Sequence, residues 1–146
     1  MKHILLIQGA NMRWLGKRQP EHYGTTTAAE LDARLRAHAD AHGYQLTIEY
    51  LDVEGEAIRR IYDAVGEGMD GLVMNPAGFT YAGYALRDCL LGVKEDLPYV
   101  ELHITNQIVR HMPEITGAAA RGVVHGFGLL SYEIALEAML KILDGG

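Results

Sequence analysis

The sequence has 146 residues, of which 49% are hydrophobic and 22% are charged, with a formal net charge of −6. This composition is typical of a single globular domain over 1–146, and the acidic balance argues against a nucleic-acid or anionic-membrane partner, because both need a basic surface. With one cysteine, Cys89, and no apolar run of the roughly 18 residues that a membrane span needs, the chain is expected to be a cytoplasmic protein without internal disulfides.

Short apolar runs alternate with longer amphipathic segments along the chain. The apolar runs predict strands at 3–8, 45–52, 70–75, 98–104 and 121–128, and the amphipathic segments predict helices at 26–43, 54–68, 80–96 and 129–143. Thr26 or Thr27 can cap the first helix, since Glu30 follows Thr27 by three residues, and Gly43 is placed to end that helix. The strand at 45–52 alternates polar and apolar residues, which favours a position near the edge of a sheet.

This alternation predicts an α/β fold with a doubly wound sheet of five parallel strands, joined by right-handed crossovers, with helices on both faces. In open sheets of this kind, ligands bind outside the carboxyl ends of the strands. The polar residues that end or directly follow a strand are therefore the candidate site residues. They are Asn11 in the first loop, Asn75 after the third strand, and Glu101, His103 and Thr105 around the end of the fourth.

Glu101 and His103 point to the same side of the fourth predicted strand, because side chains alternate with a period of two. A carboxylate there could hold the imidazole in one tautomer and keep a proton on it, which suits a general acid or base. A histidine at a strand end can equally be a core residue with a backbone partner. The position of His103 alone leaves both interpretations open.

The loop at 16–27 carries Arg18 and Tyr23, whereas plain turns are built mainly from Gly, Pro, Asn and Ser. Surface loops also contain such pairs, so the two residues alone do not define a site. A phenol, with an ordinary pKa of about 10, is a poor base unless a nearby cation favours its phenolate. An arginine close to Tyr23 in a pocket closed from water could therefore make this tyrosine a base.

Other signals in the sequence are weaker. The "GFG" at 126–128 is interpreted as a turn, and Tyr81 and Tyr84 are expected to pack on a helix face. No HExxH or CxxC motif is present and the seven histidines are scattered, so no metal site is expected.

Three segments resemble one known family over nearly the whole chain. They are "GANMRWLGKRQPEHYGTTT" at 9–27, "NPAGFTYAGYALRD" at 75–88 and "VELHITN" at 100–106. Together they are similar to the type II 3-dehydroquinate dehydratases, which are small flavodoxin-like hydro-lyases of the shikimate pathway and of quinate catabolism.

The resemblance implies a lyase that dehydrates 3-dehydroquinate to 3-dehydroshikimate through an enolate. It implies no metal or organic cofactor, a small carboxylate substrate, and homo-oligomers in which trimers build a dodecamer. Tyr23 would be the base, assisted by Arg18, while His103 would be the acid, supported by Glu101, and Asn11 would hold a water that stabilises the enolate. The residues expected to bind substrate are Asn75, Tyr81, Asp88, Ile104, Thr105 and Arg110, with Asp88 reaching the site of a neighbouring subunit.

The chain departs from the family pattern at positions that would bind the substrate ring. Tyr81 replaces a histidine, Val53 stands where an imidazole is usual, and the segment after Asn106 is shorter. That segment has no clear Arg-Arg-His-Ser run, for which Arg110 or His111 would substitute. Two alternatives stay open: a paralogue that uses the same acid and base on a different hydroxy or oxo carboxylate, and a non-catalytic protein that binds a small carboxylate. A receiver domain and a flavin carrier share the architecture, but the acidic pair of the first and the phosphate loop of the second are missing.

Overall fold

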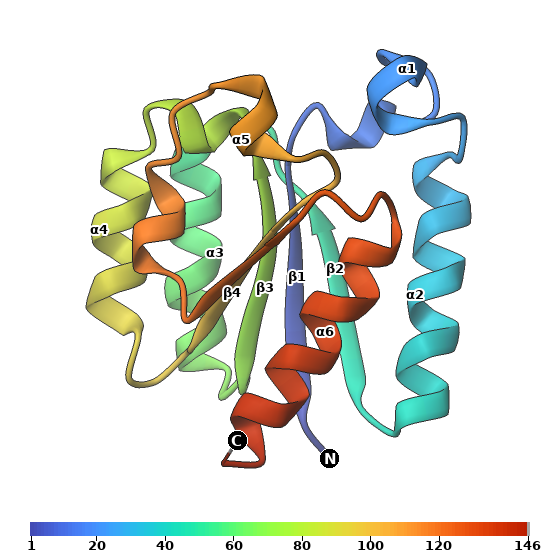
Figure 1. Cartoon of the computed structure of the whole chain (residues 1–146). Coiled ribbons are helices and arrows are strands. Elements are labelled where there is room, and N and C mark those ends of the chain that lie inside the picture. Colours follow the sequence, from blue (N-terminus) through green and yellow to red (C-terminus); the bar gives the residue numbers. More distant parts are fainter. Residues whose placement is uncertain (146) are drawn as a thin grey trace.

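The computed structural model describes residues 1–145, apart from the side chain of His22, so the last residue of the domain expected over 1–146 lies outside the described range. Five strands form one sheet in which all neighbours are parallel, in the order β2-β1-β3-β4-β5 (Figure 1). The strands are β1 (His3–Ala10), β2 (Gln45–Tyr50), β3 (Gly71–Ala77), β4 (Tyr99–His103) and β5 (Gly122–His125). The predicted α/β sheet is confirmed, and its strand order is that of flavodoxin-like folds.

The helices connect successive strands and also occupy two segments that were expected to be loops. The α-helices are α1 (Pro20–Tyr23), α2 (Ala28–His42), α3 (Glu54–Gly66), α4 (Tyr84–Val93), α5 (Gln107–Arg110) and α6 (Leu130–Leu143). Three 3₁₀ turns add to these: η1 (Met12–Trp14), η2 (Gly78–Tyr81) and η3 (Thr116–Ala119). The short helices α1 and α5 were not predicted, because four residues are too few to show a helical period.

The ends of several elements follow from local chemistry. Thr27 and Glu30 form the expected capping box of α2, and Gly43 ends that helix with a φ of 70°. The helix expected over 80–96 begins only at Tyr84, because residues up to Tyr81 belong to a separate 3₁₀ turn and Ala82 leaves helical geometry with a φ of −148° and a ψ of 29°. The strand expected over 121–128 ends at His125, since Gly126 turns the chain with a φ of 95°.

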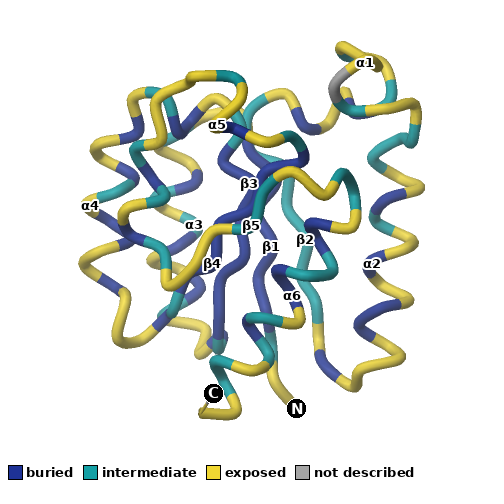
Figure 2. The backbone as a smooth tube through the Cα atoms, viewed as in Figure 1, coloured by how far each residue is buried: buried dark blue, intermediate teal, exposed yellow. Residues whose placement is uncertain are grey.

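The sheet is covered on both faces by helices. α2 and α6 lie over one face and α3 and α4 over the other (Figure 1). Alternate residues of β1 point into the two cores, so Leu6 packs with the α2 and α6 side and Leu5 with the α3 and α4 side. The central strands are buried while β2 and β5 are partly exposed (Figure 2), which confirms β2 as an edge strand. No helix within residues 1–145 is long and apolar enough to cross a membrane.

The strand order also decides where a ligand can bind. The chain leaves β1 in one direction to reach β2 at the edge and then returns to β3 on the other side of β1. At such a switch point the connections diverge and leave a crevice beyond the carboxyl ends of the strands. Gly9 permits this close arrangement, because a Cβ at this position would lie 2.3 Å from the Pro76 carbonyl oxygen.

We expect Gly9→Ala to destabilise the protein by about 2 kcal/mol or more, since the added methyl group forces β1 and β3 apart. Gly92→Ala is the matched control, because its Cβ would meet no atom within 4 Å on helix α4. The control is expected to gain up to about 1 kcal/mol from the lower flexibility of its unfolded chain. Urea denaturation measures both changes, and equal stabilities of the two variants would contradict the close approach of β1 and β3.

Candidate active site

One pocket lies at the carboxyl ends of β1, β3 and β4, where the switch point places it. It is lined by Met12, Arg18, Tyr23, Asn75, Ala77, Gly78, Tyr81, His103, Ile104, Gln107 and Arg110. Its cavity is about 30 Å³, which holds only a few water molecules. Seven residues expected to form the site line this pocket together: Arg18, Tyr23, Asn75, Tyr81, His103, Ile104 and Arg110.

His103 is held in place by the carboxylate of Glu101, which is fully buried. Oε2 of Glu101 accepts a hydrogen bond from Nε2 of His103 at 2.8 Å, as the shared side of the strand predicted. Oε1 of Glu101 accepts hydrogen bonds from the hydroxyls of Tyr99 at 2.6 Å and Thr116 at 2.5 Å. Burial, and then the charge of Glu101, raise the pKa of Tyr99 far above its ordinary value, so this hydroxyl stays protonated and donates. The carboxylate therefore has a partner for each of its oxygens, and the imidazole has a fixed orientation.

A second carboxyl group, which the sequence did not indicate, also faces His103. Oε2 of Glu114 lies 3.3 Å from the same Nε2 atom. Burial raises the pKa of Glu114 and the charge of Glu101 raises it further, although His103 and His125 act in the opposite direction. Glu114 lies between α5 and η3, in an irregular segment whose sequence has no period, so only the folded chain shows that it reaches the imidazole.

Tyr23 is surrounded by two arginines rather than one. The guanidinium of Arg18 lies over the tyrosine ring, with its central carbon 4.6 Å from the ring centroid. Nη1 of Arg110 donates a hydrogen bond to the hydroxyl of Tyr23 at 3.2 Å and another to the hydroxyl of Thr105 at 3.3 Å. Burial lowers the pKa of Arg110, but its hydrogen bond with Tyr23 and the charges around it outweigh burial and leave the pKa raised. The hydroxyl of Tyr23 therefore has a charged donor from a residue whose alignment with the family was insecure.

Asn75 forms the floor of the pocket at the end of β3. Its Nδ2 donates to the hydroxyl of Tyr132 at 2.9 Å, and that hydroxyl donates to Oε1 of Gln8 at 2.7 Å. Its Oδ1 accepts a hydrogen bond from the backbone N–H of Ala77 at 3.1 Å. Ala77 has a φ of 50° and a ψ of −129°, a conformation that residues other than glycine rarely adopt. The backbone of the pocket wall is therefore locally strained at Ala77, and its hydrogen bond with Asn75 holds it there.

Four of the expected site residues do not line the pocket. Glu101 lies behind His103, and Thr105 lies behind Arg110. Asn11 is exposed and its backbone N–H donates to the carboxylate of Asp52 at 3.0 Å. Asp88 is exposed on α4 and lies 3.9 Å from Arg87. Conversely, the sequence did not indicate Met12, Ala77, Gly78 and Gln107 as lining residues.

The comparison with known proteins agrees with this geometry. The family model described as dehydroquinase class II matches residues 2–140. The chain belongs to the dehydroquinase class II family. A "3-dehydroquinate dehydratase" from Cellvibrio japonicus is 43% identical over 147 residues, which cover 98% of this chain and 97% of that protein. A protein of the same name from Xanthomonas campestris is 42% identical, with 99% of this chain and 98% of that protein covered.

Solved structures of dehydroquinases are also similar to this chain over almost its whole length. A type II dehydroquinase from Propionibacterium acnes has a TM-score of 0.86 and 30% identity, over 99% of this chain and 97% of that one. A "3-dehydroquinate dehydratase-like protein" from Bifidobacterium longum has a TM-score of 0.74 and 28% identity, over 99% of both chains. The family and the fold expected from the sequence are both confirmed.

Thr116→Val keeps the shape of the side chain but removes one donor to the buried carboxylate of Glu101. We expect the free energy of unfolding to fall by about 1.5 to 3 kcal/mol, the range for hydrogen bonds to charged groups. Thr47→Val is the control, because its hydroxyl contacts the ring of His3 in a partly exposed position. Urea denaturation measures the free energy of unfolding of both variants. If Thr116→Val lost no more of it than Thr47→Val, the hydrogen bond to the buried carboxylate would not contribute as proposed.

Proposed function

We propose that this chain dehydrates 3-dehydroquinate to 3-dehydroshikimate through an enolate, with Tyr23 as the base and His103 as the acid. Family membership and the names of the relatives support the substrate and the reaction. The observation that carries the assignment of roles is the content of one pocket. Its lining includes a tyrosine with two guanidinium groups and a histidine whose ring contacts two carboxyl groups that lie outside the lining.

The two arginines prepare Tyr23 to take a proton. A hydrogen bond from Arg110 and the positive charge of Arg18 both favour the phenolate over the phenol. The phenolate removes a proton from the carbon beside the ring ketone, and the electron pair of that C–H bond moves to form the enolate. The two guanidinium groups act best when the pocket is closed, because charge interactions strengthen where water is excluded.

His103 completes the elimination on the leaving hydroxyl. When the enolate re-forms the ketone, the C–O bond breaks and the electron pair leaves with the hydroxyl oxygen. His103 gives that oxygen a proton, so water departs and a carbon–carbon double bond remains. Glu101 keeps the imidazole correctly oriented and stabilises its protonated form, while Tyr23 returns its proton to solvent and His103 regains one.

We propose that the loop at 16–27, which brings Arg18 and Tyr23 into the pocket, moves to admit the substrate, since the cavity is about 30 Å³. We assign the substrate carboxylate to Ile104 and Thr105, with Arg110 next to them, and a ring hydroxyl to Asn75 and Tyr81. Asn11 is proposed to hold a catalytic water. For this role, the exposed side chain of Asn11 must rotate toward the pocket when substrate binds.

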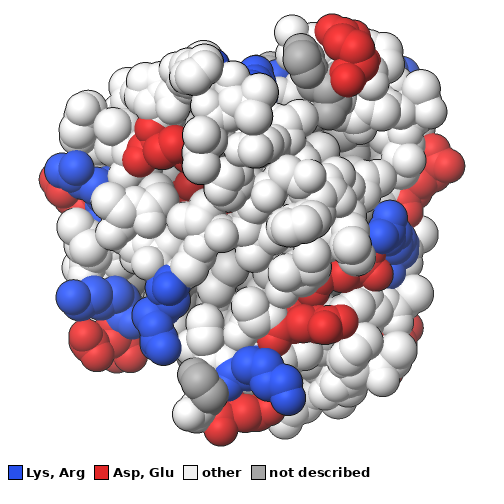
Figure 3. Space-filling model, in the orientation of Figure 1, with Lys and Arg blue, Asp and Glu red and all other residues white. Residues whose placement is uncertain are grey.

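We further propose that the chain assembles as trimers within a dodecamer, in which Asp88 reaches a neighbouring site. Asp88 is exposed and away from its own pocket, which supports this role. Large apolar side chains are exposed on α5, on β5, in the connection after β5 and at the start of α6: Ile108, Val109, Val123, Phe127 and Leu130. The middle of the face in Figure 3 carries few charged side chains, and most of those in view lie toward its margins. An apolar surface of this kind is typical of a subunit contact.

Tyr23→Phe removes the proposed base and leaves the ring that packs under Arg18. We expect kcat on 3-dehydroquinate to fall by about 100-fold or more, measured from the ultraviolet absorbance of the conjugated enone acid. Tyr62→Phe on the exposed surface of α3 is the control and should keep full activity. Near-normal turnover by Tyr23→Phe would refute the base assignment. No turnover by the folded wild-type protein would refute the substrate and favour the paralogue that acts on another carboxylate.

Arg110→Gln tests which arginine prepares the base. The activity of the wild-type protein should rise with pH as the base loses its proton, and losing the donor to its hydroxyl should move this rise to higher pH. We expect the pH at which activity rises to increase more in Arg110→Gln than in Arg18→Gln. In Arg110→Lys, which keeps the charge, this pH should return part of the way to the wild-type value. The pH dependence of kcat/KM measures this, and an unchanged profile with only a raised KM would show that Arg110 binds substrate and does not activate Tyr23.

A further inference from the structure

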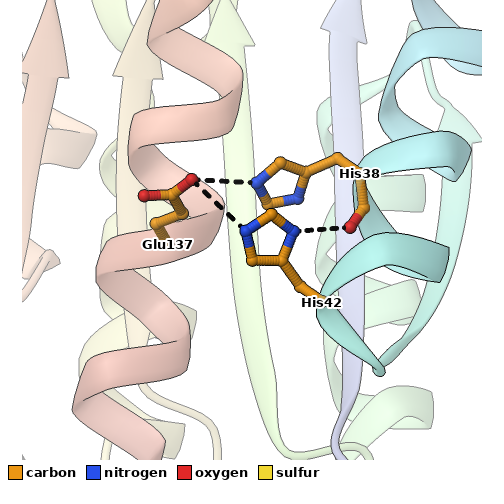
Figure 4. A group of neighbouring side chains, drawn as sticks. All are labelled: His38, His42 and Glu137. Atoms are coloured by element: carbon orange, nitrogen blue, oxygen red, sulfur yellow. Dashed lines mark hydrogen bonds and ion pairs between the residues drawn. The ribbon is translucent and has the colours of Figure 1, made fainter.

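A second cluster of ionisable side chains lies between α2 and α6, outside the pocket. His38 and His42 are four residues apart on α2 and so lie on the same face of that helix. Glu137 of α6 points toward both rings (Figure 4). Its Oε1 is 3.2 Å from Nε2 of His38 and 3.7 Å from Nε2 of His42.

The hydrogen bonds of His42 decide which of its nitrogens is free. Its Nδ1 lies 2.9 Å from the backbone carbonyl of His38, and a carbonyl can only accept. The Nδ1 atom must therefore carry the proton, so the Nε2 atom of neutral His42 presents a lone pair to the carboxylate. Two acceptors that face each other at this distance repel unless a proton, a water molecule or a metal ion lies between them.

The second histidine can also turn a lone pair to the same place. Nδ1 of His38 lies 2.9 Å from the hydroxyl of Tyr44, and a hydroxyl donates or accepts as needed. With Nδ1 of His38 donating to Tyr44, its Nε2 is free as a ligand. The two rings are stacked with centroids 3.9 Å apart, so both present their Nε2 atoms on the side that faces α6.

We propose that His38, His42 and Glu137 bind one divalent transition-metal ion, of which Zn²⁺ is the best match. The three ligand atoms lie within 4.8 Å of one another. Four-coordinate zinc with bonds of about 2.1 Å separates its ligands by about 3.4 Å, between the two distances from Glu137 to the rings. Two imidazoles and a carboxylate are ligands that zinc prefers, with water in the fourth position.

The surroundings allow an ion to enter and hold it in place. The side chains of His42 and Glu137 are 43% and 57% exposed, so they can turn until their lone pairs converge. The outer partners of the rings are the carbonyl of His38 and the hydroxyl of Tyr44, and such groups commonly orient metal-bound histidines. The bound ion links α2 to α6 across one face of the sheet, and it stabilises the fold because it binds only the folded state.

Calorimetric titration of the metal-stripped full chain with ZnCl₂ tests the site. We expect His42→Gln and Glu137→Gln each to lose one binding event of the wild-type protein, or to weaken it by at least about 10-fold. Asp40→Asn is the matched control: it removes one negative charge from the exposed surface of α2, as Glu137→Gln does on α6, and should bind as the wild type does. Circular dichroism confirms that each variant is folded without zinc.

The pocket cluster of Glu101, His103 and Glu114 also brings three possible ligand atoms within 4.8 Å. The test therefore compares the wild type with the His42 and Glu137 variants and asks which binding event the variants lose. The total number of zinc ions bound by the wild type does not decide it. Unchanged zinc binding in both variants would overturn the proposal, as would absence of binding to the wild-type chain at about 100 µM zinc. Equal weakening by Asp40→Asn would also overturn it, because binding would then depend only on surface charge. With zinc present, the wild-type Tm should rise by several degrees, and that of Glu137→Gln should rise by less.

Discussion

The buried carboxylate of Glu101 is the interaction on which the rest of the site depends. A charge with no exposure is stable only when every oxygen has a donor, since removing one partner of such a group commonly costs several kcal/mol. Tyr99 and His103 come from the same strand, but Thr116 comes from the 3₁₀ turn after the loop. The carboxylate therefore fixes both the imidazole at the end of β4 and the chain segment that returns beneath it. This return also brings Glu114 to the imidazole.

The pocket separates its charges in a way that suits an acid and a base in one small volume. Tyr23 is next to two cations, and His103 is next to two carboxyl groups. Cations favour the deprotonated phenol, whereas anions favour the protonated imidazole. The two neighbourhoods therefore differ in sign, as the proposed roles of Tyr23 as base and His103 as acid require. Opposed environments of this kind let one site carry out both proton transfers near neutral pH.

The period of the strands located the site residues at the strand ends, whereas the loop composition and the family motifs located Arg18 and Tyr23. Asn75, Glu101 and His103 were found because periods of two and 3.6 place the strand ends, and parallel strands bring those ends to one edge. Arg110 was uncertain because the segment after Asn106 is short and irregular, and only the fold shows that it reaches Tyr23. Contacts between loops depend on the path of the chain in space, which no local pattern encodes. The same reason explains why Asn11, which was chosen because it follows the first strand and then from the family motif, lies outside the pocket.

The proposed zinc site and the pocket lie on different parts of the fold. α2 begins beside the carboxyl edge of the sheet and runs back along it, so His38 and His42 lie near its far end (Figure 1). α6 connects the two regions, since it carries Glu137 and also Tyr132, whose hydroxyl bonds with Asn75 at the pocket floor. Those bonds of Tyr132 are buried and form without any ion. An ion between α2 and α6 would therefore act on the stability of the helix layer and leave the chemistry of the pocket unchanged.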